Sequence, residues 1–161
     1  MKRLLFALIP LLQMCSCSPS PPATQEYTDK ECGFRIQRPI GWQKHTAGGH
    51  TKVLFNEGGR TQINVACQAG SEKEMAETQE TYRRTVPEFA ELEGQWVTAH
   101  ERRAFFQTIS WSTPYGKHTA LRLYVPTGDR FFTVTAMSPT GQFDEWAPLL
   151  RECVMSFEVL P

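Results

Sequence analysis

The stretch that decides the fold is residues 104–137, AFFQTISWSTPYGKHTALRLYVPTGDRFFTVTAM. It predicts three consecutive β-strands over 104–112, 119–125 and 130–137, because apolar residues alternate with other residues in each. The two connections between them, PYGK and PTGD, each combine a proline, which fixes φ, with a glycine, which tolerates positive φ. We therefore expect an antiparallel meander near the centre of a sheet.

Each predicted strand places an apolar set on one face, and two phenylalanines fall on the opposite face. Those two, Phe106 and Phe131, are either covered by helices on both sides of the sheet or exposed as an apolar patch. In the second case they are the candidate protein-binding surface. The apolar sets are Phe105, Ile109 and Trp111; Leu121, Leu123 and Val125; and Phe132, Val134 and Ala136.

The rest of the chain adds strands and two helices. Ser71 and Glu74 have the spacing of a capping box, which predicts a helix that runs to about Thr85. Asp144 is the predicted N-cap of a final helix to about Val154. Runs of strands with one helix between them and another at the end indicate an α+β fold, an antiparallel sheet of about six to seven strands sandwiched by helices. Further strands are expected within 27–38, 51–55, 61–68 and 95–101, with a short extended tail at 156–159.

The N-terminus has the pattern of an export signal. Lys2 and Arg3 precede an apolar run of nine residues, 4–12, which is too short to span a bilayer but typical of a signal peptide. The following residues, Met14-Cys15-Ser16-Cys17, resemble a bacterial lipoprotein signal in which Cys17 becomes the acylated N-terminus. Cys15 fits that pattern less well, and a cleaved soluble export signal is the remaining alternative.

The lipoprotein interpretation divides the chain into three parts. Residues 1–16 would be the signal peptide, 17–26 the lipidated cysteine with a flexible Pro/Ser-rich tether, and 27–161 one globular domain. It places the protein in the bacterial cell envelope, anchored by lipid. Ser18 after the acylated cysteine favours the periplasmic face of the outer membrane, where the host has one.

The composition argues against several function classes. The formal charge is zero, and loss of residues 1–16 would leave it at −2, so no basic surface for nucleic acid is expected. Nucleophile and phosphate-loop motifs are absent from the sequence. The four histidines, His45, His50, His100 and His118, are scattered without metal-ligand spacing. We predict no cofactor, no metal and no enzymatic activity.

Three cysteines belong to the predicted domain, and an exported protein can keep disulfides. If the meander alternates direction and the last helix runs antiparallel to the third strand, Cys67 and Cys153 lie at the same end of the sheet. They are the leading candidate pair, with buried free thiols as the alternative. Cys32, in a predicted turn, could instead pair across a dimer.

The order of these elements, together with GFRI at 33–36, PIGW at 39–42 and RFFTVTA at 130–136, resembles the Mog1/PsbP-like superfamily, including small bacterial lipoproteins of unassigned function. The resemblance implies an α/β/α sandwich. It also implies binding to other proteins, since named members bind a nuclear-transport GTPase or photosystem II. The sequence thus predicts an envelope lipoprotein that acts as a non-catalytic protein-binding or accessory module with an unknown envelope partner. A small-ligand or lipid carrier and an envelope enzyme with an unrecognised site are the alternatives.

Overall fold

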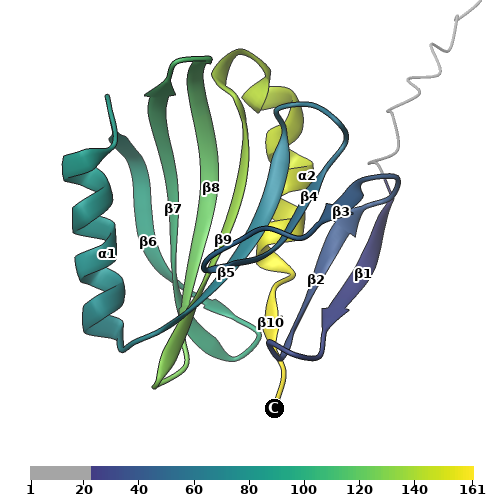
Figure 1. Ribbon diagram of the computed structural model, residues 1–161, viewed down its shortest axis with the longest axis vertical. Helices are drawn as coiled ribbons and strands as arrows, with labels where there is room; N and C mark the ends of the chain where they lie inside the picture. Colours follow the sequence, from purple (N-terminus) through teal and green to yellow (C-terminus); the bar gives the residue numbers. More distant parts are fainter. Residues whose placement is uncertain (1–22) are drawn as a thin grey trace, which may run out of the picture.

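The computed structural model describes residues 23–161 and contains two α-helices, one 3₁₀ turn and ten strands. Figure 1 shows the strands as a large twisted sheet with a smaller sheet beside it. The elements are β1 Thr24–Asp29, β2 Phe34–Pro39, β3 Gln43–His45, β4 Thr51–Asn56, β5 Gln62–Ala69, α1 Glu72–Thr85, β6 Ala90–Ala99, β7 Arg102–Thr113, β8 Gly116–Pro126, β9 Arg130–Pro139, η1 Thr140–Gln142, α2 Phe143–Met155 and β10 Glu158–Val159.

The large sheet has seven antiparallel strands in the order β3-β4-β5-β9-β8-β7-β6, and β1, β2 and β10 form the second sheet. The predicted meander is confirmed as β7-β8-β9. Its turns use the expected glycines, Gly116 at φ 117° and Gly128 at φ 102°. The predicted α+β class and the number of strands are confirmed as well.

The two faces of the large sheet carry different covers, because neighbouring residues of a strand point to opposite sides. Phe132 of β9 belongs to the main core, in which α2 and the small sheet pack. Phe131, the residue before it, packs instead with Met75 of α1. Helices therefore lie on both sides of the sheet, as an α/β/α sandwich requires (Figure 1).

The proposed docking surface on the meander is not exposed. Phe106 and Phe131 are each 1% exposed, and they face opposite sides of the sheet. Phe106 lies in the main core and Phe131 lies under α1, so each is covered by a different layer. The structure therefore shows the alternative in which both side chains are covered. The expectation that these two residues form an exposed apolar patch is wrong.

Three of the differences from the expected element boundaries concern α2, β6 and β1. Asp144 lies in the first turn of α2 rather than at its N-cap, because η1 precedes the helix and Gln142 occupies the cap without a side-chain hydrogen bond. β6 begins at Ala90, earlier than predicted, since pairing with β7 continues through a bulge between Glu91 and Glu93. β1 begins at Thr24, so part of the predicted tether belongs to the domain.

Cys32, Cys67 and Cys153 are free thiols, so the predicted Cys67–Cys153 disulfide is not formed. Cys153 is buried in the main core, where desolvation raises the pKa of its thiol to about 12. The predicted signal peptide and Cys17 lie outside the described residues. Within residues 23–161, no helix is long and apolar enough to cross a membrane.

Candidate ligand-binding site under helix α1

The face of the large sheet opposite α2 has an incomplete cover. Seven strands spaced about 4.8 Å apart form a surface roughly 29 Å wide, whereas one helix is about 10 Å across. On the α2 side the small sheet adds a second cover, and the ring of Phe34 of β2 packs edge-to-face against that of Phe132, at 6.0 Å between ring centroids. On the other side α1 alone leaves a hollow of about 440 Å³ beside it.

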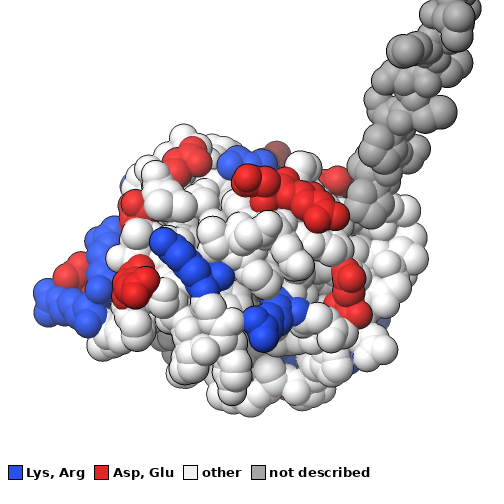
Figure 2. Space-filling model, turned by 90° about the horizontal axis from the view of Figure 1, so that it is seen from above, with Lys and Arg blue, Asp and Glu red and all other residues white. Residues whose placement is uncertain are grey.

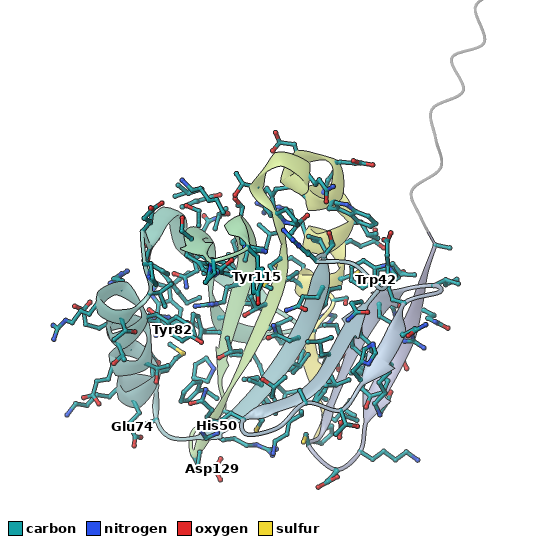
Figure 3. The ribbon with its side chains drawn as sticks, turned by 45° about the horizontal axis from the view of Figure 1, so that its top comes forward. Trp42, His50, Glu74, Tyr82, Tyr115 and Asp129 are labelled. Atoms are coloured by element: carbon teal, nitrogen blue, oxygen red, sulfur yellow. The ribbon has the colours of Figure 1, made fainter. Side chains whose placement is uncertain are left out.

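We call this cavity the α1 hollow. It joins segments that are distant in sequence: Figure 3 labels Tyr82, on α1, and His50, in the loop before β4, and both line it. Strands β4, β5, β7, β8 and β9 supply most of its wall. The lining residues are His50, Thr51, Asn64, Ala66, Gln68, Thr78, Tyr82, Val86, Phe89, Ile109, Trp111, Arg122, Tyr124, Thr133, Thr135 and Met137.

A row of polar side chains crosses the sheet under α1. Antiparallel register places Asn64 of β5 opposite Thr135 of β9, Thr135 opposite Arg122 of β8, and Arg122 opposite Gln107 of β7. Directly opposite residues point to the same face, so the four side chains lie on one side. Three of them, Gln107, Arg122 and Thr135, are buried. Asn64, Arg122 and Thr135 of this row line the hollow and give it a polar floor.

Arg122 is the charged member of that row and is only 6% exposed. Its Nε donates to the hydroxyl of Thr135 at 3.2 Å, and one Nη1 hydrogen is donated to the hydroxyl of Tyr124, also at 3.2 Å. Its guanidinium carbon lies 4.6 Å from the centroid of the Tyr82 ring. Among residues 23–161 no carboxylate lies within ion-pair distance of Arg122.

One end of the α1 hollow is apolar and the other is polar. The apolar end lies near the C-terminal end of α1 and is lined by Val86, Phe89, Ile109 and Trp111. The opposite end carries uncharged polar groups and an imidazole, from Asn64, Gln68 and His50. An apolar wall with a few placed polar groups is the usual composition of a small-molecule site.

Helix α1 is fixed over the sheet by its two ends. A capping box at Ser71 and Glu74 defines its start, and Met75 packs beneath it on Tyr124 and Phe131. Near its C-terminal end, Arg83 pairs with Glu91 of β6 at 2.5 Å. These contacts hold Tyr82 over the Arg122 guanidinium, so the position of α1 determines the shape of the hollow.

The titratable side chains that line the hollow are those of His50, Tyr82, Arg122 and Tyr124. Burial raises the pKa of Tyr124, while the nearby Arg122 opposes that rise, so the phenol stays protonated at neutral pH. Within the described chain no Asp or Glu lines the hollow, and no group of three or more His, Cys, Asp or Glu could hold a metal ion. Its groups can orient a ligand through hydrogen bonds and one positive charge.

Within residues 23–161, none of the sequence-predicted site residues lines the α1 hollow, and Cys67 packs against the main core. Phe106 and Cys153 lie in the main core, and Phe131 lies under α1. Three of the residues that line it, Asn64, Arg122 and Thr135, had one signal in the sequence, since each is a polar residue between apolar neighbours of a strand. Arg122 stands between Leu121 and Leu123, and its burial could not be inferred without the position of α1.

The remaining surface has mixed charge. Figure 2 shows basic and acidic side chains interspersed over the face that it presents. This distribution agrees with the zero formal charge of the sequence. The face drawn in Figure 2 has no continuous basic stripe of the kind that would follow a nucleic-acid backbone.

Comparison with known proteins gives similarity in structure but not in sequence. No protein-family model matches the chain, and no curated protein matches it. A cyanobacterial PsbP (CyanoP) from Synechocystis superposes with a TM-score of 0.64 and 13% identity, over 91% of this chain and 98% of that one. The chain has the Mog1/PsbP-like fold.

Two further solved structures share this Mog1/PsbP-like architecture. LpqN, which is involved in cell envelope biogenesis of Mycobacterium tuberculosis, has a TM-score of 0.58 and 9% identity over 89% of this chain and 87% of its own. A Pseudomonas aeruginosa protein of unknown function, described as a putative regulator, has a TM-score of 0.58 and 13% identity over 86% of this chain and 98% of its own. At these identities the likeness establishes the fold alone.

Proposed function

We propose that this protein is a non-catalytic accessory protein of the cell envelope that acts by binding a small ligand in the α1 hollow. The observation that carries the proposal is the hollow itself: a cavity of about 440 Å³ over the centre of the sheet, with a buried arginine in its floor. Its volume falls within the usual range of small-molecule sites. Of the three functions considered from the sequence, the geometry supports the small-ligand alternative best.

The envelope location rests on two independent supports. The segment before the domain has the pattern of a lipoprotein signal, with Cys17 as the acylated residue. LpqN, which shares the fold, is a protein of envelope biogenesis. Two or more acyl chains on one cysteine suffice for stable attachment to a bilayer.

The ligand-binding proposal is tested by filling the hollow. Ala66 lies on β5 in the lining, whereas Ala69 is exposed near the end of the same strand and outside it. The full chain is purified from its native host as wild type, Ala66→Phe and Ala69→Phe, then denatured, and released small molecules are identified by mass spectrometry. We expect one compound from wild type and Ala69→Phe that is missing from Ala66→Phe. The same small molecules in all three samples, or none in any, would reject the proposal.

The lipid anchor makes a separate prediction. The intact mass of the mature native protein should correspond to a chain that begins at Cys17 and carries acyl groups. The variant Cys17→Ser should leave the membrane fraction, because the anchor is lost. An unmodified mature N-terminus would contradict the anchor without affecting the ligand site.

A protein partner is the second candidate, and two exposed apolar side chains on β6 favour it. Leu92 is 61% exposed and Trp96 is 41% exposed, and Trp96 lies beside α1. Affinity capture of the full chain from detergent-solubilised envelope would test this surface. A specific protein that is recovered with wild type and Ala66→Phe, but not with Leu92→Ser, would support it. Equal recovery with Leu92→Ser would contradict it.

A further inference from the structure

We infer that the α1 hollow selects a small monocarboxylate with an apolar or aromatic body, whose carboxylate is bound by Arg122. This inference rests on the proposed function, since it names the chemical class of the ligand for the same site. It depends on three features of the hollow: an unpaired buried cation, the number of charges around it, and an apolar wall on one side.

The guanidinium of Arg122 has donors left over. Of its five N–H groups, two are donated to the hydroxyls of Thr135 and Tyr124. Within the described chain Nη2 has no protein acceptor, yet it is not among the buried unpaired atoms, so it meets the open space of the hollow. A cation that is 94% shielded from solvent by the protein is costly unless an anion or good acceptors surround it. A bound anion would supply the missing partner.

The charges around Arg122 favour a ligand that carries a single negative charge. Arg122 carries the one formal charge among the lining residues of the described chain. Arg83, the other cation that acts on Tyr124, already pairs with Glu80 and Glu91. A monoanion is balanced by Arg122 alone, whereas a phosphate monoester would keep an excess charge in a poorly solvated site. The planar guanidinium also matches the geometry of a carboxylate.

The body of the ligand follows from the wall beside the guanidinium. Val86, Phe89, Ile109 and Trp111 form the apolar end of the hollow. Burial of an apolar group against that wall removes apolar surface from water, which favours binding. A carboxylate on Arg122 would direct the attached chain or ring along that wall.

A structural role for Arg122 is the competing explanation. Its guanidinium lies on the Tyr82 ring, and this contact alone could serve to hold α1 on the sheet. The two roles differ in what they require of a ligand. If Arg122 only holds α1 on the sheet, the affinity of the hollow for a small molecule should not depend on the charge of that molecule. If Arg122 binds a carboxylate, the affinity should depend on it.

The experiment compares three probes of the same size class by isothermal titration calorimetry: 3-phenylpropionate, its neutral amide 3-phenylpropanamide, and phenyl phosphate. The full-length proteins are wild type, Arg122→Lys, Arg122→Met, Ala66→Phe and the matched control Ala69→Phe. Circular dichroism and thermal unfolding confirm that each variant is folded. The comparison of carboxylate with amide on wild type needs no variant, so it stands even where Arg122→Met does not fold.

We expect wild type and Ala69→Phe to bind 3-phenylpropionate at least ten-fold more tightly than the amide and than phenyl phosphate. Arg122→Met should lose that preference, Arg122→Lys should keep part of it, and Ala66→Phe should bind none of the probes. Equal affinity for carboxylate and amide, lost in Ala66→Phe, would overturn the inference while the ligand-binding proposal stands. A preference for phenyl phosphate, or no binding of 3-phenylpropionate to wild type, would also overturn it. The ligand-binding proposal is then decided by the compounds released from the native protein.

Discussion

Arg122 is buried without a carboxylate partner among residues 23–161. Its nearest polar partners are neutral hydroxyls. Removing a guanidinium from water costs several kcal/mol, and neutral acceptors compensate only part of that cost. At the residue scale, then, the polar floor of the hollow is a feature that opposes folding and favours binding.

Replacement of Arg122 by methionine should therefore not destabilise the protein. We expect the free energy of unfolding in urea to be unchanged or higher by about 1–2 kcal/mol, because a poorly compensated buried charge is removed. Thr135 and Tyr124 lose a donor but face a hollow that water can enter. A loss of stability above about 2 kcal/mol would show that Arg122 is mainly a structural contact between α1 and the sheet.

Cys153 gives a pH prediction. Its folded pKa of about 12 lies above the ordinary value of 9.0, because burial disfavours the thiolate. Above pH 9 the unfolded chain loses this proton while the folded chain keeps it, so stability is complete below pH 9 and falls as the pH rises toward 12. The slope should approach 1.4 kcal/mol per pH unit.

Urea unfolding at pH 8 and pH 10.5 under reducing conditions measures this slope. In Cys153→Val the part due to the thiol should disappear. A smaller alkaline loss should remain, since the pKa of Tyr124 is also raised by burial. An unchanged slope in Cys153→Val would contradict the assignment.

At the scale of elements, α1 is the least firmly attached cover of the sheet. Met75 is its one buried residue, and its other contacts with the sheet include surface ion pairs and the packing of Tyr82 on Arg122. Exposed ion pairs contribute little to stability. The capping box therefore carries much of the stability of α1, and through α1 it supports the position of Tyr82.

Removal of the cap should loosen α1 selectively. In Ser71→Ala the first turn loses a hydrogen bond worth about 1 kcal/mol. Amide hydrogen exchange in α1 should then become about five-fold faster, while the central strands β8 and β9 keep their protection. Thr81→Ala, an exposed change in the middle of the same helix, is the control and should have no such effect. Equal acceleration across the sheet would contradict this picture.

At the scale of the whole molecule, the two sides of the sheet serve different purposes. On one side α2 and the small sheet close a continuous apolar core. Phe157 joins these layers, with its ring centroid 5.5 Å from that of Phe34 and 5.3 Å from that of Phe132. On the other side α1 alone leaves room for the hollow. One face thus supplies the stability that an open polar site on the other face requires.

This division predicts the effect of a core mutation. Phe157→Ala should lower the free energy of unfolding by about 3–5 kcal/mol, because a fully buried ring is removed where three layers meet. The exposed Tyr115→Ala is the matched aromatic control and should change stability by less than about 0.5 kcal/mol. Similar losses for both variants, measured in urea, would contradict the proposed division.

The amino-acid sequence by itself determined the meander, its two turns, the cap of α1 and the α+β class. These depend on alternation, on proline and glycine at turns, and on one local hydrogen-bond pattern, all of which act between residues close in the chain. The sequence resemblance also led to the correct fold, although its motifs describe the core and not the site. The N-terminal lipoprotein pattern stays a prediction.

The tertiary structure alone decided where the polar residues of the strands meet. Asn64, Thr135, Arg122 and Gln107 become neighbours only through the pairing of β5, β9, β8 and β7. The same alternation in sequence could not say which face a single helix would leave open, and for this reason it could not decide between exposure of Phe106 and Phe131 as a docking surface and their coverage by helices. The physical reason is that burial is a property of layers packed together, whereas alternation records only that a strand has two sides.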